Sequence, residues 1–361
     1  MKRSTIAILS IILTAMTLSC QPMNRTADIS DRVYALALQG DVKQAIAVLD
    51  SIPPRDLTKD LKKLRDDSHK RFIEGVDPEP PAGSDSGAVG LLRIFQGYWR
   101  NALMKTAPDS ILEERLLADV SAYLKQQYPP AATLSVKKIQ ERIEPLYLGY
   151  LKSRGYHSTE PGKTGTLYDL LVWREEETKD YRIELPGGLQ NVRVVFMDKF
   201  LTLGWEEFAT FGTSYPGGWT KPNALYCVKA AYDTSSEDFR VSYLTHEAQH
   251  FADNACYPKL QQQDLEYRAK LAELSKTNEM KDRLIKRFIV NALDDSTQAH
   301  SFADHCLVRD LSRKVFSQEY VADPARWEKI KAPVINMAAR ELLKANSAAL
   351  DQIKDVERLL R

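Results

Sequence analysis

The chain has 361 residues, of which 43% are hydrophobic and 27% are charged, and these are the proportions of a globular protein. The 50 basic side chains nearly balance the 49 acidic ones, so the basic excess of a typical nucleic-acid-binding protein is missing and we expect no nucleic-acid partner. The 4 cysteines are too few for a disulfide scaffold, and the length allows one large or two moderate domains.

Residues 1–19 have the pattern of a secretory signal peptide. The positive start, Lys2-Arg3, precedes an uncharged run over 4–19, which is shorter than the ~20 residues that span a bilayer as a helix. The run ends in TLSC, a sequence that resembles the lipoprotein box of bacteria. We therefore expect lipidation at Cys20 and a protein tethered to a membrane of the bacterial cell envelope, facing the periplasm or the exterior. Plain secretion and an uncleaved anchor are the alternatives.

Residues 21–76 are expected to be helical. Apolar residues recur at helical spacing over 29–46, interrupted by Gln39-Gly40-Asp41, and a charged helix is predicted over 57–72. Helix, Gly-Asp turn and helix resemble one tetratricopeptide-type hairpin. A single hairpin of this kind cannot bury its own faces. We expect a helical adaptor or spacer here, with a protein or peptide partner on these helices as the alternative.

The pattern changes twice after this segment. Residues 77–88 are rich in Pro, Gly and Ser and predict a linker, which is followed by a helical region over 89–164. From Gly165 short β-rich runs follow, and after Asp238 the pattern is helical to the end. A block of strands before a block of helices predicts an α+β fold for residues 165–361. The expected strands are 167–173, 181–185, 192–197 and 224–232, with Pro186-Gly187-Gly188 as a hairpin turn.

The chemistry is concentrated in the motif HEAQH at residues 246–250. It is an H-E-x-x-H pattern, and residues four apart share one face of a helix, so the imidazoles of His246 and His250 can reach one metal ion. Glu247 would then lie beside the ion, placed to accept a proton from water rather than to bind the metal. The alternative is a pair of core histidines that bind no metal.

A catalytic zinc ion takes three protein ligands and leaves a fourth position open. The H-x-x-G-x-x-H continuation is absent, because Asp253 and Cys256 occupy the Gly and His positions. We expect the third ligand to be Glu266 on the next helix, in whose N-cap region Asp264 is predicted to lie. Glu273, Asp253 and Asp264 are the alternatives.

The segment 212–274 resembles the catalytic domain of gluzincin-type zincin metallopeptidases, in which two histidines of one helix and a glutamate of the next hold zinc. The resemblance implies a Zn²⁺ site made of His246, His250 and Glu266, and a peptide or protein substrate. It also implies that the strand at 224–232 is the sheet edge that lines the cleft, where a peptide would pair with its backbone.

The residues that would orient the expected metal ligands differ from the pattern of that family. Familiar members carry an Asp near the glutamate ligand that orients a histidine, whereas Lys270 stands four residues after Glu266 here. Asp253 or Asp264 is the expected substitute.

A hydrogen-bond donor across from the base is expected to stabilise the transition state. His300, on a helix predicted over 297–307, is the first candidate for this role. The others are His305, Tyr232 and Tyr267.

The remaining cysteines, Cys227, Cys256 and Cys306, would face an oxidising compartment. They show no C-x-x-C spacing, so we expect a disulfide or buried thiols rather than a metal site.

Together these features predict an envelope-tethered zinc metallopeptidase with Glu247 as general base. The competing hypothesis is a non-catalytic envelope scaffold whose zinc site is structural or vestigial. A Cys or His in the fourth coordination position, Cys256 above all, would favour the scaffold.

Overall fold

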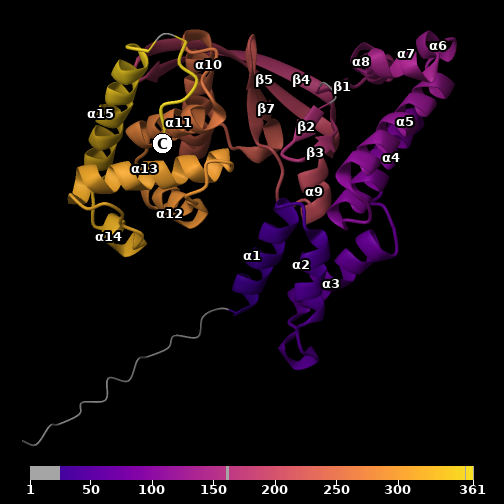
Figure 1. The fold of residues 1–361 in the computed structure, drawn as a ribbon, viewed down its shortest axis with the longest axis horizontal. Helices are drawn as coiled ribbons and strands as arrows, with labels where there is room; N and C mark the ends of the chain where they lie inside the picture. Colours follow the sequence, from indigo (N-terminus) through magenta and orange to yellow (C-terminus); the bar gives the residue numbers. More distant parts are fainter. Residues whose placement is uncertain (1–24, 160–161, 354, 361) are drawn as a thin grey trace, which may run out of the picture.

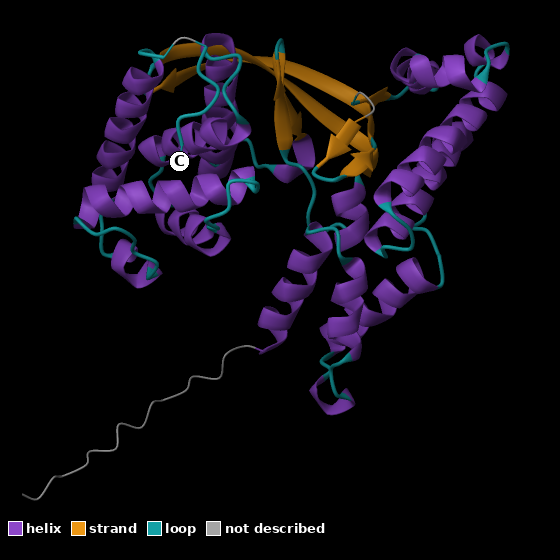
Figure 2. Cartoon of the chain, in the orientation of Figure 1, coloured by secondary structure: helices purple, strands orange, loops and turns teal. Residues whose placement is uncertain are grey.

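The computed structural model describes residues 25–159, 162–353 and 355–360. It has the expected α+β composition, with helices before, beside and after a curled sheet (Figure 1, Figure 2). The predicted signal peptide over 1–19 and Cys20 lie outside the described residues. Within those residues no helix is both long and apolar enough to cross a membrane.

The N-terminal helices follow the predicted pattern. Helices α1 (Arg25–Leu38) and α2 (Val42–Asp50) are joined by a turn in which Gly40 has a φ of +76°, a value that glycine tolerates best. The Asp41 side chain caps α2 by accepting from Gln44 N. Helix α3 (Lys59–Ser68), which continues as a π-helical turn (His69–Ile73), packs on this hairpin. The small core that they share contains Val33, Ala45, Leu49, Ile52, Leu61 and Leu64.

The segment predicted as a linker is held against the helix that follows it. Helix α4 begins at Ser86, and Asp77 forms ion pairs with Arg93 and Arg100 of that helix. Arg93 also donates to the carbonyl oxygen of Pro78 at 2.9 Å. After α4 (Ser86–Leu103) come α5 (Asp109–Gln127), α6 (Pro129–Ala132), α7 (Val136–Glu141) and α8 (Ile143–Ser153).

One hydrophobic core crosses the predicted domain boundaries. Phe72 of the N-terminal helices, Trp99 of α4 and Phe208 of α9 (Trp205–Thr210) belong to the same buried cluster. The Trp99 indole also donates to the carbonyl oxygen of Tyr168 at 2.8 Å. The N-terminal helices and the base of the sheet therefore share their packing.

The main sheet of the described residues has the order β1-β4-β5-β7-β6. Strand β4 pairs antiparallel with β5 through the predicted Pro186-Gly187-Gly188 turn, β5 pairs parallel with β7, and β7 antiparallel with β6. Strands β2 and β3 form a separate two-stranded sheet. The bounds are β1 (His157–Ser158), β2 (Gly162–Thr164), β3 (Leu167–Asp169), β4 (Leu171–Leu185), β5 (Gly188–Leu203), β6 (Gly218–Lys221) and β7 (Ala224–Val228).

The predicted strands were wrong in extent. The run 167–173 is divided between β3 and β4, 181–185 is only the end of β4, and 192–197 is the middle of the longer β5. The charged run over 174–180 lies inside the long strand β4, because cross-strand pairs such as Arg193–Asp180 at 3.0 Å and Lys199–Glu175 at 2.5 Å satisfy its exposed charges. The strand expected at 224–232 ends at Val228 and continues as a 3₁₀ turn (Lys229–Ala231).

The edge of the sheet was also placed wrongly. Strand β7 is the penultimate strand, and β6 forms the edge. Gly218 makes this pairing possible, because a Cβ atom there would lie 2.3 Å from the carbonyl oxygen of Tyr226. The apolar run of β7 is buried by the two strands beside it, and the shorter, polar β6 keeps an open edge.

The chain after Asp238 is helical, as predicted. A π-helical segment (Phe239–Thr245) leads into α10 (His246–Cys256), which packs between the sheet and α11 (Gln262–Lys276). Helix α11 is buried from Gln263 to Ser275 because α10, α13 and α15 surround it (Figure 1). The other helices are α12 (Lys281–Asn291), α13 (Ala299–Phe316), α14 (Pro324–Glu328) and α15 (Ala332–Leu350).

Candidate metal centre

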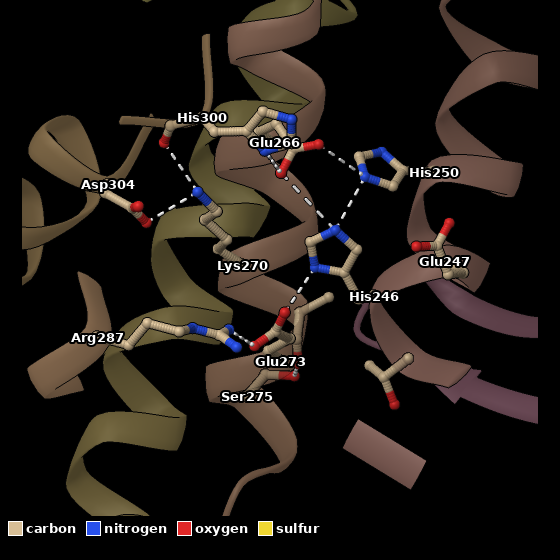
Figure 3. Close-up of polar contacts among 12 residues, drawn as sticks. His246, Glu247, His250, Glu266, Lys270, Glu273, Ser275, Arg287, His300 and Asp304 are labelled. Carbon is tan, nitrogen blue, oxygen red and sulfur yellow. Dashed lines mark hydrogen bonds and ion pairs between the residues drawn. The ribbon is translucent and has the colours of Figure 1, made fainter. Parts of the chain in front are cut away.

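The two histidines of α10 face a glutamate of α11. The Nε2 atoms of His246 and His250 are 3.0 Å apart, and the carboxylate of Glu266 lies 3.8 Å and 3.3 Å from them (Figure 3). Zinc bonds of about 2.0–2.1 Å in a tetrahedron place neighbouring donors about 3.3 Å apart. The three side chains predicted as ligands are therefore brought together at separations that suit one metal ion.

The Glu266 carboxylate is ionised although it is only 3% exposed. Burial alone would raise its pKa, but hydrogen bonds with His250 and His300 and the charge of His246 hold that pKa well below its usual range. Gln262, one turn earlier on α11, donates to the same carboxylate at 3.0 Å. A buried anion beside two imidazoles is the charge pattern that a divalent cation neutralises.

The orientation of His246 depends on Glu273, whose role as a hydrogen-bond partner of that histidine was not predicted. Its Nδ1 lies 2.6 Å from Oε1 of Glu273, and Arg287 of α12 holds the other carboxylate oxygen at 3.1 Å. Burial would lower the pKa of His246, but the Glu273 hydrogen bond and the charges of Glu266 and Glu247 outweigh it and raise the pKa to about 9. A carboxylate on Nδ1 turns Nε2 toward the metal position.

Glu273 could have been found from its spacing. It lies seven residues after Glu266, and two helical turns place both side chains on one face of α11. From the sequence it is only an alternative metal ligand. In the structure it contacts the ligand histidine instead.

The two aspartates expected to orient a histidine have other partners. Asp253 accepts from Nε and Nη2 of Arg268 at 2.8 Å and 2.7 Å. Asp264 accepts from the backbone N–H groups of Leu359 and Leu360. It is not the N-cap of α11 either, because that helix begins at Gln262. Neither aspartate belongs to the group around the histidines.

Glu247 lies beside the metal group without being part of it (Figure 3). Thr220 of the edge strand β6 donates to its Oε2 at 2.6 Å and to its backbone carbonyl oxygen at 3.2 Å. The side chain is half-buried, so solvent can reach it. The carboxylate is therefore held in place by the strand that forms the edge of the sheet.

Of the predicted hydrogen-bond donors, His300 is the one that contacts the group formed by His246, His250 and Glu266. It lies in the first turn of α13, its side chain is 70% exposed, and its Nδ1 is 3.0 Å from Oε2 of Glu266. Lys270 fixes this turn by donating to the carbonyl oxygen of His300 at 2.9 Å and pairing with Asp304 at 2.8 Å.

The other candidate donors point elsewhere. The hydroxyl of Tyr267 donates to Asp310 at 3.0 Å, and the ring of His305 stacks on Tyr320. Tyr232 packs against the ring of Tyr243, with its hydroxyl beside Gly217.

The cysteines take no part in the centre. Cys227, Cys256 and Cys306 are free, and none is a member of the metal group. Burial raises the pKa of the Cys227 thiol to about 12, which keeps it protonated. Cys256, the residue that would have favoured a closed structural site, is exposed at the end of α10.

Comparison with known proteins adds no relative. No family model matches the chain, and neither a curated protein nor a solved structure does.

Proposed function

We propose that the protein is a zinc-dependent metallopeptidase of the gluzincin type. The observation that carries the proposal is the convergence of His246, His250 and Glu266 within 4.8 Å of one another, beside Glu247 on the same helix as the histidines. Two imidazoles and one carboxylate are a donor set of catalytic zinc sites.

The described residues supply the groups that peptide hydrolysis needs. His246, His250 and Glu266 would hold the zinc ion, and the Lewis acidity of a zinc ion bound there would polarise a carbonyl and lower the pKa of water toward about 7. Glu247 accepts the proton of the attacking water and passes it to the leaving amine nitrogen. Thr220 holds one oxygen of Glu247 and leaves the other for the proton. His300 donates to the charge that develops on the carbonyl oxygen.

The open edge of β6 gives a peptide a place to bind. An extended peptide adds to an exposed sheet edge through backbone hydrogen bonds. Since Thr220 of β6 contacts Glu247, a peptide paired with this strand would lie beside the base. This arrangement favours a peptide over a small ester or amide as substrate.

Two features favour catalysis over a structural zinc site. Structural sites fill all four positions with protein ligands, whereas the group found among the described residues has three members. A structural site also needs no base, and Glu247 is held beside the centre by a strand.

The first experiment combines metal content with activity. Purified protein is expected to contain about one zinc per chain by mass spectrometry and to cleave members of a peptide library. Glu247→Gln should keep the zinc and lose about 10²–10⁴-fold in kcat/KM, the usual contribution of a general base. The matched control is Glu341→Gln on α15, where Glu341 forms an exposed ion pair with Lys314 of α13.

Two results would refute the proposal. Hydrolysis by Glu247→Gln at the wild-type rate would remove the assigned mechanism. Absence of zinc even after reconstitution would make the histidine pair a core feature and the helical scaffold the better account.

The proposed location, on a membrane of the bacterial cell envelope through a lipid on Cys20, rests on the N-terminal sequence. Cys20→Ala should abolish incorporation of labelled fatty acid and release the protein from the membrane fraction. Unchanged labelling would show that Cys20 is not the anchor.

A further inference from the structure

Two adjoining cavities lie beside α9, where the N-terminal helices meet the base of the sheet. Their volumes are about 380 and 270 Å³, and their linings share Arg71, Pro78, Glu79 and Phe211. Ligand pockets commonly measure about 300–1,000 Å³, so the two together can take a small molecule. Helix α9 contacts α1, α4 and β5 (Figure 1). Neither lining includes a member of the proposed metal centre.

Arg71 is a half-buried cation that forms no ion pair within the described residues. The rings of Phe208 and Phe211 lie against its guanidinium, with centroids 5.1 Å and 4.2 Å from Cζ. Its Nη1 donates to the carbonyl oxygen of Phe208 at 2.6 Å. Nε and Nη2 have no hydrogen-bond partner in that same part of the chain, and neither is a fully buried atom. This open edge is one through which an arginine binds a carboxylate with two parallel hydrogen bonds.

Gln96 adds a second donor to the smaller cavity. The residue is only 3% exposed and lines that cavity. Its Oε1 accepts from Nη1 of Arg93 at 2.9 Å, which fixes the orientation of the amide. Its Nε2 has no acceptor among the residues that the structure describes. A donor so deeply placed favours an acceptor, and a carboxylate oxygen supplies one.

Glu207 of α9 brings a half-buried carboxylate to the same cavity. Its Oε2 accepts from the backbone N–H of Leu203 at 2.7 Å, and its Oε1 has no donor within the described ranges. Burial raises the pKa of Glu207 and lowers the pKa of Arg71, and the charge of each opposes the shift of the other. The two groups therefore sense each other without forming an ion pair. Buried charges of this kind favour a partner of opposite sign in direct contact.

The walls restrict the class of ligand. A purely anionic molecule would meet the carboxylates of Glu207 and Glu79, and a purely cationic one would meet the guanidinium of Arg71. Apolar surface is supplied by Phe200 and Leu201. A small molecule that carries an ammonium, a carboxylate and an apolar group satisfies all three features.

We infer that these cavities form a binding site for a free α-amino acid with an apolar side chain. Its carboxylate would pair with the Nε–Nη2 edge of Arg71 and accept from Gln96. Its ammonium would pair with Glu207, and its side chain would contact Phe200 and Leu201. Such a ligand places both charges on neighbouring atoms, as the unpaired groups of the cavity require.

Calorimetric titration of the purified protein compares L-leucine with two analogues that each lack one charge. Leucinol keeps the ammonium without the carboxylate, and 4-methylpentanoate keeps the carboxylate without the ammonium. Neither contains a peptide or amide bond, so catalysis cannot consume them. Near neutral pH, leucine should bind with a Kd of about 1 mM or tighter, and at least tenfold more tightly than either analogue.

Two variants locate the binding. Glu207→Gln keeps an acceptor for Leu203 and loses the charge, so leucine should bind no more tightly than 4-methylpentanoate. Arg71→Lys keeps the charge and loses the two-pronged edge, so leucine should bind at least tenfold more weakly and leucinol should be unaffected. Glu341→Gln, the exposed control, should match the wild type. Thermal unfolding verifies that each variant is folded, and the comparison of the three ligands on the wild type decides the inference if one is not.

Three results would overturn the inference. They are no binding of leucine at millimolar concentration, an affinity for either analogue equal to that for leucine, and leucine binding that survives both variants. The last result would place the amino acid elsewhere, for example at the metal centre. Absence of peptidase activity would refute the proposed function and leave this site unaffected, because the binding test uses no peptide.

Discussion

His246 of α10 is held by two carboxylates that both belong to α11. Glu266 lies near its Nε2, and Glu273 is bonded to its Nδ1. Which nitrogen of an imidazole can bind a metal depends on the partner of the other nitrogen. Glu273 would therefore determine whether His246 presents a free electron pair to a metal ion bound there.

Glu273→Gln should weaken zinc binding by about tenfold or more, the usual cost of losing a residue that orients a metal ligand. The amide can still accept from Nδ1, but it lacks the charge that increases the basicity of the imidazole. Competition with a fluorescent chelator measures the effect, and Glu341→Gln on the surface provides the baseline. Equal zinc affinity in the two variants would show that Glu273 is only a core partner.

The pairs Gly187-Gly188 and Gly217-Gly218 look alike in the sequence, but the structure leaves different amounts of space around them. A Cβ atom on Gly187 would meet nothing within 4 Å, whereas one on Gly218 would lie 2.3 Å from a backbone oxygen and 2.6 Å from the ring of Tyr243. The backbone of Tyr226 lies inside the sheet and cannot move without a large cost in free energy. A side chain at position 218 would therefore displace the edge strand β6, and Thr220 with it.

Gly218→Ala should cost about 2 kcal/mol of unfolding free energy, a typical penalty for overpacking, and should also lower kcat/KM. Gly187→Ala should stay within about 0.5 kcal/mol of the wild type. Urea denaturation of the two variants gives the comparison. Equal midpoints would mean that the edge strand tolerates displacement.

At the scale of elements, helix α11 is a case in which hydrophobic periodicity does not indicate which residues are buried. Its buried residues include Asp264, Glu266, Arg268, Lys270 and Glu273. Each face of the helix packs against a different element, so its polar residues find partners on every side. A buried helix of this kind has no apolar stripe, because ion pairs and metal ligands replace part of its hydrophobic contacts.

Asp264 ties α11 to the C-terminal segment by accepting two backbone N–H groups, those of Leu359 and Leu360. Asp264→Ala should destabilise the protein by about 3 kcal/mol, since one buried and one half-buried donor lose their acceptor. Asp355→Asn, which keeps a residue that tolerates the positive φ of this position and removes only the charge of an exposed pair with Lys259, should have little effect. Thermal unfolding followed by circular dichroism compares them, and similar melting temperatures would contradict the assigned contact.

At the scale of the whole molecule, the shared core links regions that the sequence pattern separates. Phe72 lies edge-on against Phe208 and Phe211, with ring centroids 5.5 Å and 6.3 Å away. The N-terminal helices are therefore packed on the segment that leads from β5 to β6. Unfolding of these helices should be coupled to the sheet that carries the site.

Phe72→Ala should cost about 3–5 kcal/mol and preserve a single unfolding transition. Loss of helix, followed by circular dichroism, and release of zinc, followed by a chelating dye, should then share one midpoint. Two separate midpoints would mean that the N-terminal helices unfold as an independent domain.

The sequence was informative wherever a local pattern sufficed. The H-E-x-x-H spacing, a glutamate on the next helix and a turn glycine each depend on neighbours a few residues away, and the structure brings His246, His250 and Glu266 together as expected. The α+β order and most helices follow from periodicity of the same range.

Tertiary structure decided what depends on partners distant in the sequence. The edge position of β6, the pairing of Glu273 with His246 and the hydrogen bonds of Asp264 with the C-terminal segment all arise from contacts across tens of residues. A carboxylate has the same local signature whether it binds a metal, orients a histidine, caps a helix or holds the chain end. Only the burial and the partner supplied by packing distinguish these roles, because both set the free energy of its charge.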